Sequence, residues 1–367
     1  MDSYDFSPLL VLALLSLALG AVPLAWIMFR HRNAAPGVRL RALTVLTLFL
    51  TFDLVVFGAF TRLTDSGLGC PDWPGCYGNA SPLGAHADIQ TAQTAMPTGP
   101  VTHGKAWVEM VHRYLATVVG VLIIALTVAS WRAAKLGRAV LSPWWASATL
   151  VWVCLQGAFG ALTVTMKLYP AIVTAHLLGG LTLLVLLAVQ SQAHVRAPLA
   201  LTRKLHRAVW LVFALSVIQI TLGGWVSTNY AVLACSDFPT CQGQWWPAMD
   251  FEHGFAVLRE LGAGKDGDYL PFAALTAIHF THRVGALIVL SAMAWLAWCL
   301  WESREPALRR WALALAGVAA WQLATGLSNV VLGWPLVAAL AHTAGAAALI
   351  TLLAVMLARA RQARVAS

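Results

Sequence analysis

The chain has 367 residues, of which 59% are hydrophobic and only 11% are charged, with a formal net charge of +9. Soluble domains carry about a quarter of charged residues, so this composition excludes an ordinary soluble protein. The positive charge is divided among short basic segments between apolar runs, which excludes a continuous nucleic-acid-binding surface.

Nine apolar runs follow one another along the chain, and each reaches the ~20 residues that are needed to cross a bilayer. We predict an all-α polytopic membrane protein with nine transmembrane helices, because barrel strands would be far shorter and would alternate apolar with polar residues. The first run is too long and too poorly preceded by basic residues to be a cleaved signal peptide. The predicted spans are Pro8–Phe29, Leu43–Leu63, Trp107–Trp131, Pro143–Met166, Ala171–Gln190, Ala208–Thr228, Phe272–Trp301, Trp311–Gly333 and Pro335–Leu357.

Basic residues are concentrated in every second loop and in the C-terminal tail. Under the positive-inside rule these segments lie in the cytoplasm. The N-terminus, with Asp2 and Asp5, is then predicted on the outer side of the membrane and the C-terminus on the cytoplasmic side. The basic segments are Arg30–Arg41, Arg132–Arg138, Arg196–Arg207, Arg304–Arg310 and Arg359–Arg364.

Two outer loops share a cysteine-bracketed pattern. Gly58–Gly78 reads GAFTRLTDSGLGCPDWPGCYG, and Gly223–Gly243 reads GGWVSTNYAVLACSDFPTCQG. We call the loops that contain these pairs the first and second cysteine loops. On the oxidising side of the membrane we expect disulfides within Cys70/Cys76 and within Cys235/Cys241. Metal ligation is the alternative, although each loop offers only two thiolates. Cys154 and Cys299 lie within spans, where small buried apolar residues are expected.

The duplication extends beyond the loops. The sequence Glu109-Met-Val-His112-Arg113 matches His279-Phe-Thr-His282-Arg283, 170 positions later, and Gln156, Gly160 and His176 recur 166 positions later as Gln322, Gly326 and His342. An even number of spans in each repeat makes the two repeats parallel. We therefore predict two pseudo-symmetric four-helix bundles, at residues 43–194 and 195–367, preceded by an extra N-terminal helix and cytoplasmic loop at residues 1–42.

Four histidines, His112, His176, His282 and His342, fall inside apolar spans, where polar groups are costly and usually functional. Each lies near the outer end of its span; for His112 and His176 the depth is about 8 Å, at 1.5 Å per residue. One imidazole on each of two helices, at matching depth, can hold an iron porphyrin edge-on. Zinc or di-iron sites would need further carboxylate or thiolate ligands. We predict one haem site in each half.

The two halves differ three residues before the first histidine, where Glu109 in one half corresponds to His279 in the other. A carboxyl group beside a haem could act as a base, and the alternative is an ion pair with Arg113 or Arg62. Arg62, Arg113 and Arg283 lie at outer ends of spans and could bind haem propionates, cap their helices or contact lipid headgroups. Asp53, in the middle of the second span, is either part of a proton path or a protonated partner of another helix.

Together, the motif TRLTDSG at Thr61–Gly67, the cysteine loops, the EMVHR motif and the repeated histidines resemble the haem A synthase family, in its cysteine-bearing bacterial branch. The resemblance runs from about Leu43 to the C-terminus. It implies an oxidoreductase that converts the C8 methyl group of haem O to a formyl group. The product, haem A, is a cofactor of haem-copper oxidases, so the protein would serve cytochrome oxidase assembly.

Carried over by position, the resemblance implies that His112 and His176 flank the iron of haem O and that Glu109 is the catalytic carboxylate. It implies that His282 and His342 are the axial ligands of a bound haem b. The first cysteine loop would close over the substrate haem. The extra N-terminal helix departs from the eight-span bacterial pattern.

The implied setting is the bacterial inner membrane, with the N-terminus and the cysteine loops periplasmic and the C-terminus cytoplasmic. The implied partners are haem O synthase as donor, the haem-copper oxidase assembly machinery, membrane lipid and an electron acceptor that the sequence does not identify.

Two other functions fit four intramembrane histidines: a dihaem b-type, quinol-oxidising electron-transfer cytochrome, and a haem transporter. The cytochrome would not account for a carboxylate, Glu109, in only one half. Such cytochromes also usually place their haems on opposite sides of the membrane, whereas all four histidines here lie near the outer side. The transporter would need exchangeable ligation in both halves.

Overall fold

The computed structural model describes residues 7–195, 197–265 and 267–366, and its elements are all helical. Among these residues there is no β-strand, only isolated bridges within loops. The helices are α1 (Ser7–Arg30), α2 (Pro36–Leu63), α3 (His86–Ala95), α4 (His103–Lys135), α5 (Pro143–Thr165), α6 (Pro170–Ala193), α7 (Arg203–Thr228), α8 (Phe251–Gly254), α9 (Phe272–Glu302), α10 (Pro306–Val331) and α11 (Leu336–Ala366), with a 3₁₀ turn at Ala231–Leu233.

Nine of the described helices are long and apolar enough to cross a membrane, which confirms the predicted polytopic all-α class. Several of them extend beyond the predicted spans, because an apolar run marks the lipid-embedded part of a helix whereas capping residues set its ends. Thus α2 begins at Pro36, a residue that suits the first helical turn. Helix α4 begins at His103, where the Thr102 side chain accepts a hydrogen bond from the Lys105 N–H.

Two short helices in the outer segments, α3 and α8, were not predicted. Neither contains a long apolar run, so the signal that reveals the membrane helices is absent from both. Helix α8 begins after Asp250, whose carboxylate accepts the N–H of His253. Helix α3 has Asp88 in its first turn and buries Ile89 completely.

The described residues form two compact units. The first unit comprises the described part of Met1–Leu168 together with Thr182–Val195, and the second comprises Tyr169–Leu181 and the described part of Arg196–Ser367. Helix α6 is therefore divided between the units, and its N-terminal part, which carries His176, belongs to the second unit.

Helix α4 is the centre of the first unit, where α1, α2, α3 and α5 all pack against it. Its buried face includes Leu122, Ile123 and Leu126, none of which is exposed. Helix α1 lies close to α4 because Gly20 leaves room for Val121: a Cβ atom at position 20 would lie 2.7 Å from a Val121 side-chain carbon. Helix α1, the extra N-terminal helix, is thus packed against the rest of the first unit.

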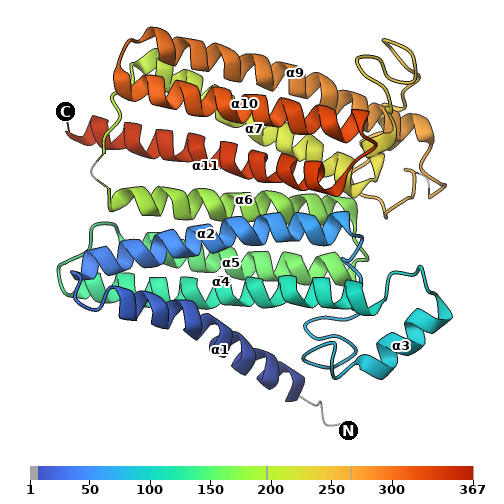
Figure 1. Ribbon diagram of the computed structural model, residues 1–367, viewed down its shortest axis with the longest axis horizontal. Coiled ribbons are helices and arrows are strands. Elements are labelled where there is room, and N and C mark those ends of the chain that lie inside the picture. The colour runs from blue at the N-terminus through green and yellow to red at the C-terminus, as the bar shows by residue number, and fades with distance from the viewer. Residues whose placement is uncertain (1–6, 196, 266, 367) are drawn as a thin grey trace. The chain divides into compact units, whose positions relative to one another are not determined.

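In the second unit, α7, α9, α10 and α11 run side by side (Figure 1), and each of α7 and α10 packs against both α9 and α11. Helices α9 and α11 therefore occupy opposite corners of a four-helix arrangement. The half of this bundle that contains the C-terminal part of α9 is filled by fully buried residues that include Leu296, Leu300 and Leu315. The other half contains His282 and His342.

Candidate haem-binding site

The four histidines of the apolar spans lie on α4, α6, α9 and α11, in the N-terminal part of each helix. His112 is nine residues from the start of α4 and His282 ten residues from the start of α9. His176 and His342 are each six residues from the starts of α6 and α11. Corresponding histidines of the two repeats therefore lie at nearly the same distance from the starts of their helices.

Three of these imidazoles lie directly against a glycine of a neighbouring helix. A Cβ atom on Gly58 of α2 would lie 3.0 Å from Cε1 of His112, and one on Gly223 of α7 would lie 3.0 Å from Cε1 of His282. On α10, a Cβ atom at Gly326 would lie 3.3 Å from Cε1 of His342. A missing side chain on one helix thus makes the space for each ring.

His282 and His342 lie on α9 and α11, at opposite corners of the four-helix arrangement in the second unit. Each has a polar partner on an adjacent helix. Nδ1 of His342 lies 3.0 Å from the Thr325 hydroxyl, and Nδ1 of His282 lies 3.0 Å from the Gln219 side-chain amide. The carbonyl oxygen of His282 accepts a second hydrogen bond from the same amide, at 2.9 Å.

The predicted disulfides are confirmed: Cys70 is bonded to Cys76 and Cys235 to Cys241. An aspartate organises each cysteine loop from within. Asp72 accepts the N–H groups of Tyr77 and Gly78, both at 2.7 Å. In the second loop, Asp237 likewise accepts the N–H groups of Gln242 at 2.6 Å and Gly243 at 3.0 Å. Hydrogen bonds from the Thr240 hydroxyl and from these N–H groups lower the pKa of the Asp237 carboxyl to about 2.

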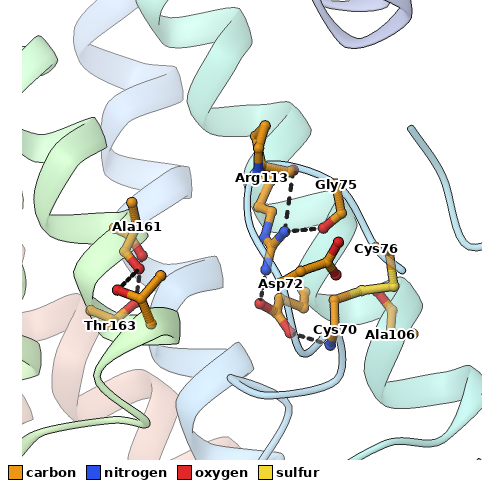
Figure 2. A network of polar contacts seen from close by, with 12 residues as sticks. Cys70, Asp72, Gly75, Cys76, Ala106, Arg113, Ala161 and Thr163 are labelled. Atoms are coloured by element: carbon orange, nitrogen blue, oxygen red, sulfur yellow. Dashed lines mark hydrogen bonds and ion pairs between the residues drawn. A yellow bond between two sulfur atoms is a disulfide. The ribbon is translucent and has the colours of Figure 1, made fainter. Parts of the chain in front are cut away.

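The first cysteine loop is fastened to the helix that carries His112. The backbone N–H of Cys70 donates to Oε2 of Glu109 at 2.8 Å, and Arg113 forms an ion pair with the other carboxylate oxygen. The Arg113 guanidinium also donates to the carbonyl oxygens of Pro74, at 3.2 Å, and Gly75 (Figure 2). Glu109 is only 3% exposed, so both of its oxygens are engaged in a water-poor setting.

The second cysteine loop is fastened in the same way to α9. Nδ1 of His279 takes the place of the carboxylate and lies 3.2 Å from the N–H of Cys235. The guanidinium of Arg283 donates to three loop carbonyl oxygens, those of Asp237 at 2.8 Å, Thr240 at 2.9 Å and Cys235 at 2.6 Å. The sequence reveals the duplicated loops but not these anchors, which explain why residues 109 and 113 flank the histidine.

The other candidates from the sequence lie as follows. Arg62, at the end of α2, approaches Asp65 with a nitrogen–oxygen distance of 4.0 Å, and Lys105 approaches the same carboxylate at 3.5 Å. Asp53 is on an exposed part of α2, in line with the exposed apolar residues Phe49 and Val45, one and two turns earlier. Contacts of Arg62, Arg113 and Arg283 with propionates stay a prediction.

The donor set suits a metal that a macrocycle already holds. No group of three His, Cys, Asp or Glu side chains with metal-binding geometry occurs in the described part of the chain. Two imidazoles suffice for haem iron, whose other four ligands are porphyrin nitrogens. At His342, a glycine against the ring and a hydroxyl partner at Nδ1 leave Nε2 as the available ligand atom.

Comparisons with known proteins agree with this chemistry. Residues 41–354 match the family COX15-CtaA, described as cytochrome oxidase assembly protein. The chain is 36% identical to the heme A synthase of Shewanella oneidensis over 318 residues, which cover 83% of this chain and 92% of the relative. It is 28% identical to the heme A synthase of Halalkalibacterium halodurans over 295 residues, or 78% of this chain and 85% of that one.

Proposed function

Since the chain belongs to the COX15-CtaA family of cytochrome oxidase assembly proteins, we propose that it is a haem A synthase. It is an oxidoreductase of the membrane that acts in haem A biosynthesis, and its substrate is haem O. The observation that carries this assignment is the family match over the same residues that contain the duplicated histidines and loops.

The reaction converts a methyl group into a formyl group. For a porphyrin substituent R this is R–CH₃ plus water giving R–CHO, four protons and four electrons. The site must therefore position one carbon of the substrate, admit water to it, accept protons and pass electrons to an acceptor outside the chain.

We assign the substrate's iron to the imidazoles of His112 and His176, as the family resemblance implies. The ring of His112 is held between α4 and α2, because Gly58 leaves room for it and the Phe57 ring stacks beside it at a centroid distance of 6.3 Å. A fixed imidazole sets the position and tilt of the macrocycle, and contacts at its edge must set the rotation that presents one methyl group to the reacting groups.

Glu109 is the carboxylate that we assign to proton transfer at the substrate methyl. The Glu109–Arg113 pair also holds the first cysteine loop on α4, so the same carboxylate connects the reacting region to its cover. A loop that excludes bulk water would restrict access to the water molecule that reacts. In the second unit His279 replaces the carboxylate, which suits a site that performs no such proton transfer.

In the second unit, His282 and His342 are the residues that would hold a resident haem b. When bound, haem b would supply reversible one-electron transfer. The chain's own part is to place both imidazoles with a polar partner at each Nδ1 and to cover the outer side with the second cysteine loop. We place the protein in the bacterial inner membrane, with the N-terminus and cysteine loops periplasmic, and haem O synthase as the donor of substrate.

Conversion of haem O by the purified full chain tests this assignment. The protein is reconstituted with haem b and haem O, an artificial one-electron acceptor is added, and extracted pigments are separated and weighed by mass spectrometry. Haem A is expected, with its oxygen derived from labelled water. Recovery of unchanged haem O beside a fully loaded haem b site would contradict the proposal.

A further inference from the structure

The two histidines that we assign to haem b, His282 and His342, have side-chain partners at Nδ1 that are supplied by α7 and α10. These partners are Gln219, beside His282, and Thr325, beside His342. Neither belongs to the motifs that the sequence repeat displays.

The hydrogen bonds of Thr325 fix the tautomer of His342. Its hydroxyl donates to the carbonyl oxygen of Trp321 one turn earlier, at 2.7 Å. Because its only hydrogen is used in that bond, the hydroxyl oxygen accepts from Nδ1–H of His342 at 3.0 Å. The lone pair of this imidazole therefore resides on Nε2, the atom that ligates iron.

Gln219 contacts His282 from a space that a glycine of α9 leaves open. Gly285 on α9 leaves the space for the amide, because a Cβ atom there would collide with Oε1 of Gln219. In the present orientation that Oε1 is buried without a hydrogen-bond partner among the described residues. A half-turn of the amide would direct the oxygen to Nδ1–H once Nε2 of His282 ligates iron, in exchange for the present hydrogen bond from the amide to the His282 carbonyl oxygen.

The first half of the chain has no polar residue at the equivalent positions. The offset of 165 between the cysteine loops matches Gln219 with Leu54, and the offset of 166 matches Thr325 with Phe159. Gly285, which makes room for the glutamine, corresponds to Leu115. Consistently, Nδ1 of His176 is buried without a hydrogen-bond partner among the described residues.

We propose that Gln219 and Thr325 are positioning residues that make the second haem site permanent, and that their apolar counterparts Leu54 and Phe159 leave the first site exchangeable. This inference rests on the proposed function, in which haem b stays bound while haem O enters and haem A leaves. A hydrogen bond from Nδ1–H makes the imidazole a stronger donor and fixes its orientation. Loss of such a partner typically weakens metal binding by about 10–100-fold.

The test replaces each partner by a residue of similar shape in the full-length protein. Thr325→Val keeps the volume and removes the acceptor; Gln219→Leu does the same at His282. Thr221→Val is the matched control, because the Thr221 hydroxyl makes the same bond to the carbonyl four residues earlier, at 2.8 Å, at an exposed point of α7. Haem b transfer to excess apomyoglobin gives the dissociation rate, and spectroelectrochemistry gives the midpoint potential.

In Thr325→Val and Gln219→Leu, haem b is expected to dissociate at least about tenfold faster than in the wild type. The potential is expected to move in the positive direction, because a weaker imidazole donor favours the reduced iron. Thr221→Val should match the wild type. A merely structural role would change neither the potential nor the rate selectively.

Unchanged dissociation and potential in both variants, with haem b present in the wild type, would overturn the inference and leave the proposed function intact. A wild-type protein that takes up no haem b in its second unit would overturn both. A variant that fails to accumulate is replaced by Thr325→Ser, which keeps the hydroxyl and is expected to behave as the wild type.

Discussion

In the proposed haem b site, replacing Gly223 by alanine should weaken haem b binding, because this glycine provides the space for the His282 ring. The new Cβ atom would lie 3.0 Å from Cε1 of the imidazole. Carbon atoms prefer about 3.5–4.0 Å, so the ring must move by at least about 0.5 Å or rotate off its rotamer. Overpacking of this kind costs about 1–3 kcal/mol. The cost falls on the haem-bound geometry, so haem affinity should fall by about 5–150-fold.

A second alanine variant gives the control. A Cβ atom added to Gly317, on α10 of the same unit, would meet no other atom within 4 Å, so Gly317→Ala adds a methyl group without a clash. Since alanine favours a helix over glycine by about 1 kcal/mol, this variant should be neutral or slightly stabilised. Gly326→Ala, where the contact would be 3.3 Å, should show an intermediate loss.

The assay titrates haem b into the purified apoprotein of each variant and follows the absorption spectrum of bis-imidazole haem. The expected order of affinity is Gly317→Ala, then Gly326→Ala, then Gly223→Ala. If Gly223→Ala bound haem b with wild-type affinity and spectrum, the ring of His282 would not depend on this space, and the structural reasoning would be refuted.

Three further results are expected. Glu109→Gln should keep the acceptor for the Cys70 N–H and retain haem b. It should lower the rate of haem A formation at least about tenfold, because it removes the proposed proton acceptor. His279→Gln, at the equivalent position of the second repeat, is its control, and normal turnover of Glu109→Gln would contradict the assignment. Arg283→Lys should lose at least two of the three hydrogen bonds from Arg283 to the second cysteine loop. The free energy of local opening of this loop should then fall by about 1–3 kcal/mol. Faster proteolysis within residues 235–241 would show the opening, and an unchanged cleavage rate would argue against this role of Arg283. The folded pKa of Asp237 is about 2, below its ordinary value of 3.8, so its stabilisation of the second cysteine loop should be present above pH 4 and disappear as the pH falls towards 2. Hydrogen exchange at neutral pH measures the same contacts: the amides of Gln242 and Gly243 should exchange faster in Asp237→Asn than in the control Asp72→Asn.

The membrane helices could be predicted from the sequence because each is a long apolar run with basic residues at one end. Histidines stood out for a similar reason: an imidazole in an apolar span is rare and costly. The disulfides followed from local spacing on the oxidising side. Each of these signals is contained in a short stretch of chain.

Features that depend on packing between helices were not accessible in this way. Gly223 and Gly326 are ordinary residues in a membrane helix until the neighbouring imidazole is known to touch them. Thr325 and Gln219 likewise acquire a role only through residues that are 17 and 63 positions away. The ion pair of Glu109 with Arg113 was one of the alternatives, but its bond to Cys70 depends on how the loop folds back.

The anchors of the first cysteine loop have a consequence for how this chain can vary. Glu109 and Arg113 lie on either side of His112, so one turn of helix sets both the direction of the imidazole and the attachment point of the first cysteine loop. Inserting a single residue between positions 109 and 112 would rotate one relative to the other by about 100°. A change of length in this turn would therefore separate the loop from the imidazole, whereas a change in the stretch around α3 would leave both in place.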